Sequence, residues 1–253
     1  MMTSLKTPIL ITLILNMFIA SAQINSSEKL VTEMHKKYVG KFNKDITFIQ
    51  MNTNYLENGK TELTTCYEAF HFPGKYRIDI GFTPNIDGVI HHNDSAYFFK
   101  EGKLVKKELE LNDVLLLTGD IYFIEPKESL SKLRNLGYNT SIFREDVWDD
   151  KPVYVVGANK GDEKSPQFWI DKENLYLVRN INKSKETGKL EDAHYVEHEI
   201  VGNVWVENKV KIYSDGKLVR MEKYTEVEPN KGLNKDIFNP NKWGSLHWHT
   251  KKK

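Results

Sequence analysis

The sequence of 253 residues contains a single cysteine, Cys66, so no internal disulfide bond can stabilise the chain. An excess of charge of one sign is also missing, because 36 basic residues are balanced by 35 acidic ones. A nucleic-acid-binding protein normally carries a basic patch or stripe, so this balance argues against a nucleic-acid partner. The fold must depend on a hydrophobic core, and we expect Cys66 to be a buried, inert part of it.

The motifs of common enzyme classes are missing as well. The sequence has no nucleophile elbow, no phosphate-binding loop and no H-E-x-x-H zinc motif. His194 and His198 would lie about 13 Å apart along a strand, too far to share a metal ion. Asp146, Asp149 and Asp150 are interpreted as a turn. We therefore expect no catalytic residues, no metal site, no cofactor and no enzymatic activity, and a hydrolase is the weakest hypothesis for the function.

One long apolar run is present, at the N-terminus. Lys6 precedes a predominantly apolar segment from Pro8 to Ala20, and Ala20 and Ala22 satisfy the small-residue rule of signal peptidase. About a dozen apolar residues are too few to span a membrane comfortably, which disfavours a membrane anchor. We expect residues 1–22 to be a signal peptide that is cleaved after Ala22, and the mature chain to be exported and soluble.

Residues 23–253 consist mainly of β-branched and aromatic runs separated by turn signals. Two runs of about a dozen residues flank Asn58-Gly59, which predicts a tight hairpin with two positive φ angles. Strands of this length suit a strongly twisted sheet. We predict a single, mostly β domain with a few helices, in which about ten or eleven antiparallel strands form a strongly twisted sheet that curls toward a barrel.

Helices are predicted at the N-terminus, from Asn25, and where leucines dominate between Leu109 and Gly137. The second group has two interpretations. Amphipathic helices usually dock on a sheet, so a pair of core-covering helices is the simpler one. The alternative is a movable lid over an apolar cavity. Near the C-terminus, a short helical turn within 233–243 is expected to cover the end of the sheet.

Arg77 is the candidate functional residue of the third predicted strand. Tyr76 and Ile78 point to one side of this strand and Arg77 to the other. Its guanidinium could hold carbonyl groups or a carboxylate of a facing element. Periodicity alone instead favours an exposed side chain that is paired with Asp79.

The segments FPGKYRIDI, AYFF, PVYVVGANKG and PQFWIDKENLYLVRNI occur in this order behind the signal and the N-terminal helix. In this combination the chain resembles the LolA/LolB-like lipoprotein carrier family, often labelled outer-membrane lipoprotein-sorting proteins. The resemblance implies a curved open barrel that is covered by helices and takes the acyl chains of lipoproteins. It also implies that Arg77 is a latch that ties the lid helices to the barrel.

The expected function is therefore that of a periplasmic, non-enzymatic carrier or binding protein for lipid or lipoprotein acyl chains, acting in outer-membrane biogenesis. The expected partners are these chains, an inner-membrane donor and an outer-membrane acceptor, with the protein itself a monomer. The main alternative is an envelope interaction or scaffold protein whose half-barrel is filled. Strand alternation leaves open which parity faces inward, and the residues proposed to line the cavity are Phe48, Tyr67, Tyr76, Ile78, Phe98, Phe99, Leu115 and Leu116.

Overall fold

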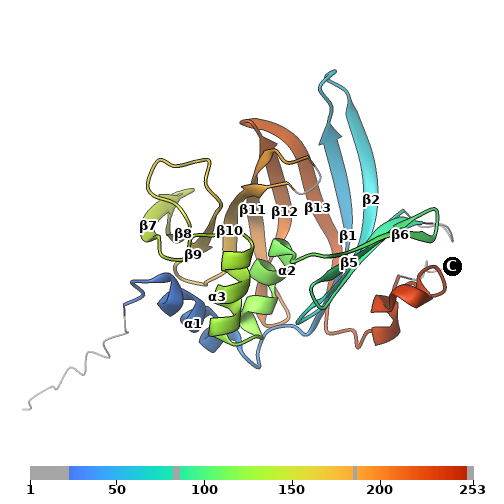
Figure 1. Ribbon diagram of the computed structural model, residues 1–253, viewed down its shortest axis with the longest axis horizontal. Helices are drawn as coiled ribbons and strands as arrows, with labels where there is room; N and C mark the ends of the chain where they lie inside the picture. Colours follow the sequence, from blue (N-terminus) through green and yellow to red (C-terminus); the bar gives the residue numbers. More distant parts are fainter. Residues whose placement is uncertain (1–22, 82–85, 185–186, 250–253) are drawn as a thin grey trace, which may run out of the picture.

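In the computed structural model, the strands form one curved, open antiparallel sheet (Figure 1). The structure describes residues 23–81, 86–184 and 187–249, so the expected signal peptide, 1–22, lies outside the described residues. The strands are β1 (Asp45–Tyr55), β2 (Thr61–His71), β3 (Lys75–Ile80), β4 (Asp87–His92), β5 (Ser95–Lys100), β6 (Lys103–Leu109), β7 (Phe143–Trp148), β8 (Lys151–Val156), β9 (Gln167–Asp171), β10 (Leu177–Lys183), β11 (Leu190–Val201), β12 (Val204–Ser214) and β13 (Lys217–Pro229). The helices are α1 (Ser27–Tyr38), α2 (Asp113–Thr118), η1 (Asp120–Tyr122), α3 (Pro126–Asn135), η2 (Lys235–Phe238) and η3 (Pro240–Lys242).

The predicted class, a mostly β, open and curved barrel with few helices, is confirmed. The described residues form 13 strands rather than ten or eleven. One of the strands missed by the sequence analysis is β7, whose sequence FREDVW has little apolar character. Asp149 and Asp150 do form the turn that follows it, with φ angles of 49° and 59°, but the placement of Asp146 in this turn is wrong, because Asp146 lies in β7 and pairs with Val153.

The strand order is β6-β5-β4-β3-β2-β1-β13-β12-β11-β10-β9-β8-β7. Two meanders, β1–β6 and β7–β13, are therefore joined by the pairing of the first strand with the last. The longest strands, including β1, β2, β11, β12 and β13, lie in the middle of the sheet, and β1 and β13 pair through an irregularity between Thr47 and Ile49. Such irregularities increase the local twist and bend of the strands. Strands β6 and β7 remain as edges, so the barrel is open.

The β1–β2 hairpin differs from its prediction at the turn. Leu56 N–H donates to the Lys60 carbonyl and Gly59 N–H to the Leu56 carbonyl, so the loop is longer than two residues. Gly59 has a φ of 78°, and Asn58 is not among the residues with positive φ. The loop therefore needs only one residue in the left-handed region, and glycine supplies it without steric cost.

Helices α1, α2 and α3 lie together over one face of the sheet, which we call the inner face (Figure 1). Helix α1 begins after Ser26, whose hydroxyl accepts a hydrogen bond from Lys29 N–H, and not after Asn25 as predicted. Its buried side chains Leu30 and Met34 belong to the same core cluster as Leu133 of α3. The helices thus have the amphipathic character that docking on a sheet requires. No helix within the described ranges is both long and apolar enough to cross a membrane.

The C-terminal segment packs on the opposite, outer face of β2–β4. Ile237 and Phe238 of η2 form a cluster with Ala69 of β2. Trp243 stacks on Phe99 of β5 at 4.2 Å between ring centroids. The segment therefore covers an outer face of the sheet, and the prediction that it closes the end of the sheet is wrong. These contacts bury apolar groups on both sides of the strands beside the cavity.

Candidate ligand-binding cavity

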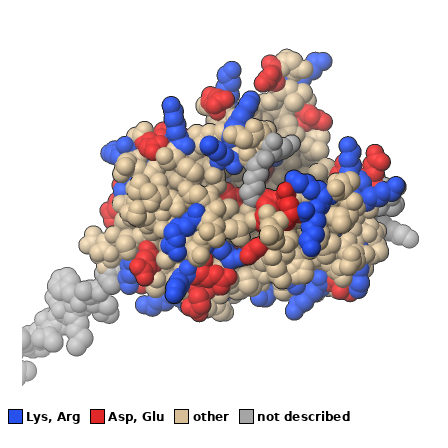
Figure 2. Space-filling view, viewed as in Figure 1, with Lys and Arg blue, Asp and Glu red and all other residues tan. Residues whose placement is uncertain are grey.

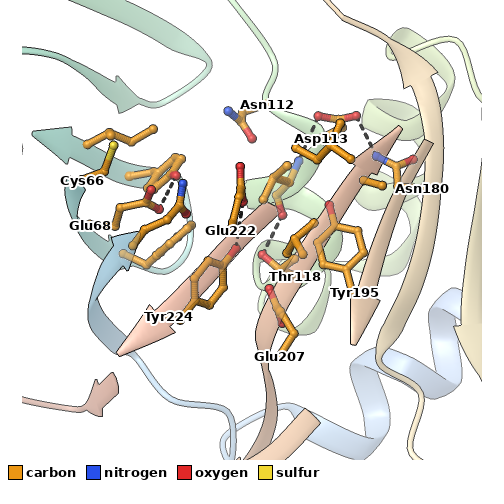
Figure 3. A pocket seen from close by; sticks show the side chains of 18 of the residues that line it. Cys66, Glu68, Asn112, Asp113, Thr118, Asn180, Tyr195, Glu207, Glu222 and Tyr224 are labelled. Atoms are coloured by element: carbon orange, nitrogen blue, oxygen red, sulfur yellow. Dashed lines mark hydrogen bonds between the residues drawn. The ribbon is translucent and has the colours of Figure 1, made fainter. Parts of the chain in front are cut away.

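A cavity of about 650 Å³ lies on the inner face of the sheet beside helix α2. Its walls come from β1, β2 and β3 on one side and from β10 to β13 on the other, and Asn112, Asp113, Val114 and Thr118 contribute from α2 and its N-cap. Cavities of roughly 300–1,000 Å³ usually hold one small-molecule ligand. The curved sheet therefore leaves room for a ligand, and a selection of the lining side chains is drawn in Figure 3.

The lining changes from apolar to polar along strand β1. Alternate residues of this strand line the cavity, as expected for a side-chain period of two. The first two, Ile46 and Phe48, are apolar, and the next three, Gln50, Asn52 and Asn54, are amides. The register places Thr64 and Glu222 beside Asn52, but it places Glu68 beside Phe48. We call the part of the cavity around the apolar residues the apolar half and the part around the amides the polar half, and Glu68 lies where the two meet.

Aromatic rings form the apolar half. Phe70 of β2 stacks on Tyr76 of β3 at 4.0 Å between ring centroids. Phe48 of β1 stacks on Tyr224 of β13 at 4.3 Å and contacts Phe70 at 5.9 Å. Phe72 extends the row from Phe70, with 5.3 Å between their ring centroids. These rings present a rigid apolar surface drawn from strands far apart in sequence.

Carboxyl groups from three strands approach the region where the two halves meet: Glu68 of β2, Glu207 of β12 and Glu222 of β13 (Figure 3). Glu68 is only 2% exposed, and it accepts a hydrogen bond of 2.5 Å from the Tyr76 hydroxyl. Glu222 accepts one of 3.4 Å from the Tyr224 hydroxyl. Tyrosine hydroxyls of the apolar half thus hold two of these carboxyl groups.

Burial raises the pKa of all three carboxyl groups, to about 8 for Glu68 and to about 7 for Glu207 and Glu222. Repulsion adds to this effect, because ionised Glu222 raises the pKa of both Glu68 and Glu207. Near neutral pH these groups are therefore partly protonated, so they both donate and accept hydrogen bonds. No group of three or more His, Cys, Asp or Glu residues in the described part of the chain could hold a metal ion.

Helix α2 is fixed to the sheet at the rim of the cavity through Asp113. One oxygen of this carboxylate, Oδ2, accepts hydrogen bonds from Asn180 Nδ2 at 3.0 Å, Asn182 Nδ2 at 3.1 Å and the Tyr138 hydroxyl at 3.2 Å. Asn112 caps the helix by accepting a hydrogen bond from Leu115 N–H. The side chain that joins α2 to the sheet is thus Asp113.

Replacing Asp113 by alanine is expected to loosen α2, because the side-chain amides of Asn180 and Asn182 lose their common acceptor. The Tyr138 hydroxyl keeps Asn180 Oδ1 as an acceptor at 2.8 Å. The free energy of unfolding should fall by about 1–3 kcal/mol, and the amides of α2 should exchange faster than those of β1 and β13. Hydrogen exchange with mass spectrometry measures both. Glu199→Ala, at an exposed position of β11, is the control and should leave exchange in α2 unchanged. Exchange rates in Asp113→Ala equal to those of the control would contradict this role.

Three of the eight residues predicted to line the cavity do so: Phe48, Tyr76 and Ile78. Phe48 of β1 and the alternating residues Tyr76 and Ile78 of β3 all face inward. Leu115 and Leu116 of α2 are buried in the core cluster beside the cavity and are absent from the described lining.

The remaining three predicted residues lie elsewhere. Tyr67 contacts the rings of His247 and His249 in the C-terminal segment, and Phe99 stacks on Trp243. Both side chains face outward, so they cannot line the cavity. Phe98 of β5 pairs with Val89 of β4. Strand alternation directs it to the inner face, opposite to Phe99, but it is not among the described residues that line the cavity. The sequence did not show which alternate residues of β2 and β5 face the cavity.

Arg77 lies on the outer face and is completely buried. Its guanidinium donates to both carboxylate oxygens of Asp79 and, at 2.7 Å, to the carbonyl of Ile237, and it stacks on Trp243 at 4.5 Å. The expected pairing with Asp79 is present, but the exposed position is wrong. The expected bonds to the helices within Leu109–Gly137 are wrong too, because strand alternation directs Arg77 away from the face that these helices cover. Its partner is the C-terminal segment.

The sequence analysis missed the three carboxyl groups Glu68, Glu207 and Glu222. A signal for Glu68 exists, because it occupies the same strand parity as Cys66 and Phe70 and so interrupts an inward-facing row. Glu222 likewise shares its parity with Tyr224. Glu207 gave no such signal, since its parity is that of Lys209, whose ammonium pairs with Glu197.

No protein-family model matches the sequence, and no curated protein matches it. Solved structures do resemble the fold. A LolA superfamily protein from Nitrosomonas europaea has a TM-score of 0.55 at 12% identity, over 85% of this chain and 98% of that one. A DUF1329 family protein from Desulfovibrio piger has a TM-score of 0.53 at 13% identity, over 84% and 95%.

A third solved structure is a domain described as an outer-membrane lipoprotein-sorting protein from Vibrio parahaemolyticus. Its TM-score is 0.52 at 11% identity, over 85% of this chain and 97% of that one. At these identities the similarity is one of fold. The LolA-like architecture expected from the sequence is confirmed at that level.

Proposed function

We propose that this chain is a periplasmic, non-enzymatic carrier or binding protein that encloses the hydrocarbon chain of a lipid or lipoprotein in the cavity of the half-barrel. The observation that carries the proposal is the cavity of about 650 Å³ with its floor of stacked aromatic rings. Burying a hydrocarbon chain there contributes roughly 0.8 kcal/mol for each methylene group removed from water. The cavity volume suits one ligand of modest size.

The LolA-like fold supports the same proposal, because two of the similar solved structures are described as a LolA superfamily protein and a lipoprotein-sorting domain. Export with removal of residues 1–22, and exchange of the cargo with a donor in the inner membrane and an acceptor in the outer membrane, are parts of the proposal. The surface agrees with a soluble carrier of balanced charge, since acidic and basic side chains are interspersed over the face in Figure 2.

The alternative of a scaffold protein with a filled half-barrel is less well supported. Side chains do not fill the space beside α2, and the polar residues around it do not form the uniform apolar core that such an interior would need. Native mass spectrometry of the protein from an envelope fraction tests the two hypotheses. Co-purified lipid supports the carrier, whereas a bare chain that also fails to bind lipid probes supports the scaffold.

Filling the cavity is expected to weaken binding of a fluorescent fatty-acid or alkylamine probe by about tenfold or more, because each lost methylene contact costs close to 1 kcal/mol. Ala193 lines the cavity from β11 and is only partly buried, so Ala193→Trp places an indole in the space. Leu63→Trp adds the same ring at a position of β2 that is 77% exposed and serves as the control. Equal affinities of the two variants in a fluorescence titration would exclude the cavity as the binding site.

A further inference from the structure

The polar half of the cavity is unusual for a site that holds only hydrocarbon. Amide groups of Gln50, Asn52 and Asn54 follow the aromatic floor along β1. Across the sheet, Asn52 pairs with Thr64 on one side and with Glu222 on the other. The amides bond to one another and to neighbours, since Gln50 Nε2 donates to Asn52 Oδ1 at 2.8 Å and Asn54 Nδ2 donates to Thr64 Oγ1 at 3.0 Å. Each amide group has two N–H donors and two lone pairs, so these bonds leave hydrogen-bonding capacity that a polar ligand can use and a hydrocarbon chain cannot. The cavity is therefore shaped and lined for a ligand with a polar end as well as an apolar one.

The charges of the lining have a clear sign. Of the described residues that line the cavity, six are acidic and two are basic: Glu68, Glu110, Asp113, Glu191, Glu207 and Glu222 against Lys183 and Arg220. Lys183 and Arg220 are both exposed, and Arg220 is already held by Asn54 at 2.9 Å and lies 3.8 Å from Glu222. Glu68 lies far deeper and is almost fully buried. The interior next to the aromatic floor is thus acidic, and the basic groups stay outside.

We infer that the cavity is specific for an amphiphile whose polar end is an amine, with the hydrocarbon chain on the aromatic floor and the ammonium group among the carboxylates of β2, β12 and β13. This inference rests on the proposed function, because it assumes that a chain occupies the apolar half. An ammonium group donates strong, charge-assisted hydrogen bonds to carboxylates and amide oxygens. It also reduces the repulsion between the carboxylates, which Arg220 offsets only at Glu222, from an exposed position 3.8 Å away.

An anionic headgroup would meet the opposite situation. A carboxylate or phosphate next to Glu68 and Glu222 adds a like charge in a region of low dielectric constant, which costs several kcal/mol unless a proton is taken up. The other polar groups that line this region include Tyr76 from β3, Tyr195 from β11 and Asp113 from α2, and the exposed Arg220 from β13. Arg220 is the basic group of this set, and it is exposed and held by Asn54, so the discrimination against an anion follows from the acidic groups of the lining.

The test uses decylamine, decanoate and decyl glucoside, which share one chain and differ in headgroup. Binding to the delipidated mature protein is measured by calorimetry at about pH 8, where Glu207 and Glu222, with pKa values of about 7, are mostly ionised. We expect decylamine to bind at least about tenfold more tightly than decanoate, with decyl glucoside between them. Decyltrimethylammonium, which is cationic without N–H donors, should bind better than decanoate and less well than decylamine.

The matched variant is Glu207→Gln/Glu222→Gln, which keeps the shape of the lining and removes its charge. The preference of decylamine over decanoate should then fall to about threefold or less, while Glu199→Gln, exposed on β11, keeps the wild-type preference. Thermal unfolding verifies that each variant is folded. Equal binding of the three probes, or a preference for decanoate, overturns the inference and leaves the proposed carrier function in place. Binding of none of them overturns both.

Discussion

Replacing Arg77 by leucine is expected to lower the free energy of unfolding by about 3–5 kcal/mol, the largest effect of a single substitution that the structure predicts. The reason is the position of its partner. Arg77 and Asp79 are both 0% exposed, and the guanidinium satisfies the carboxylate in a bidentate manner. Without Arg77, Asp79 remains as a buried carboxyl group with no cationic partner of comparable proximity, since His247 lies 3.4 Å away and its pKa is lowered by burial.

The substitution should also release the C-terminal segment, because the Ile237 carbonyl and the Trp243 ring lose the guanidinium that binds them. Urea unfolding measures the loss of stability, and limited proteolysis should detect faster cleavage within 230–249. Residues that line the cavity lie on the other face of β3, so binding of a lipid probe at a temperature well below unfolding should change little. Unchanged probe binding would show that Arg77 does not act as a latch for α2.

Two further variants control the experiment. Arg134→Leu removes an exposed arginine of α3 and should change stability by no more than about 0.5 kcal/mol. The double variant Arg77→Leu/Asp79→Leu should be more stable than Arg77→Leu alone, because replacing a buried ion pair by apolar groups is much less costly than removing one partner. A single variant as stable as the wild type would show that the pair and the C-terminal segment are not coupled in this way.

The second large effect concerns pH. We expect the ligand-free protein to lose about 2–4 kcal/mol of stability as the pH rises from about 6.5 to about 8.5. The pKa values of Glu68, Glu207 and Glu222 are raised to between about 7 and about 8 by burial, whereas in the unfolded chain they have ordinary values near 4.5. In this pH range the folded state therefore binds more protons than the unfolded state. Stability must fall as these protons are released.

Other shifted groups do not reverse the sign in this window. Burial also raises the pKa of Asp120, to about 7, which acts in the same direction. Burial lowers the pKa of His198 to about 4, and this favours folding at higher pH, but only up to its unfolded value near 6.5. Chemical unfolding at about pH 6.5, 7.5 and 8.5 measures the slope, and a stability that is constant or rises across this range would contradict the prediction.

Glu207→Gln/Glu222→Gln should flatten the pH dependence, since glutamine does not ionise and its amide is compatible with the polar half of the cavity. Glu68 and Asp120 remain, so part of the slope should persist. Glu199→Gln should keep the full wild-type slope, because that side chain is exposed. Bound decylamine should reduce the loss of stability at high pH, whereas decanoate should not.

The class of the fold could be predicted from the sequence because it depends on local patterns. Long alternating runs, as in β1, β2 and β12, require strands with one buried face, and the leucine stripe of α3 requires a docked helix. The turn at Asp149 and Asp150 was likewise readable from residue type. These features follow from the chemistry of neighbouring residues and need no knowledge of the remaining chain.

Only the tertiary structure decided which side of each strand faces the cavity. A period of two shows that Tyr76 and Arg77 face opposite ways, but it does not say which of them faces the cavity. That depended on where the helices and the C-terminal segment pack, and the segment turned the outer face of β3 into a second core that buries Arg77. The acidic interior has the same origin. Glu68, Glu207 and Glu222 meet only because β13 pairs with β1, a contact between the ends of the chain that no local pattern contains.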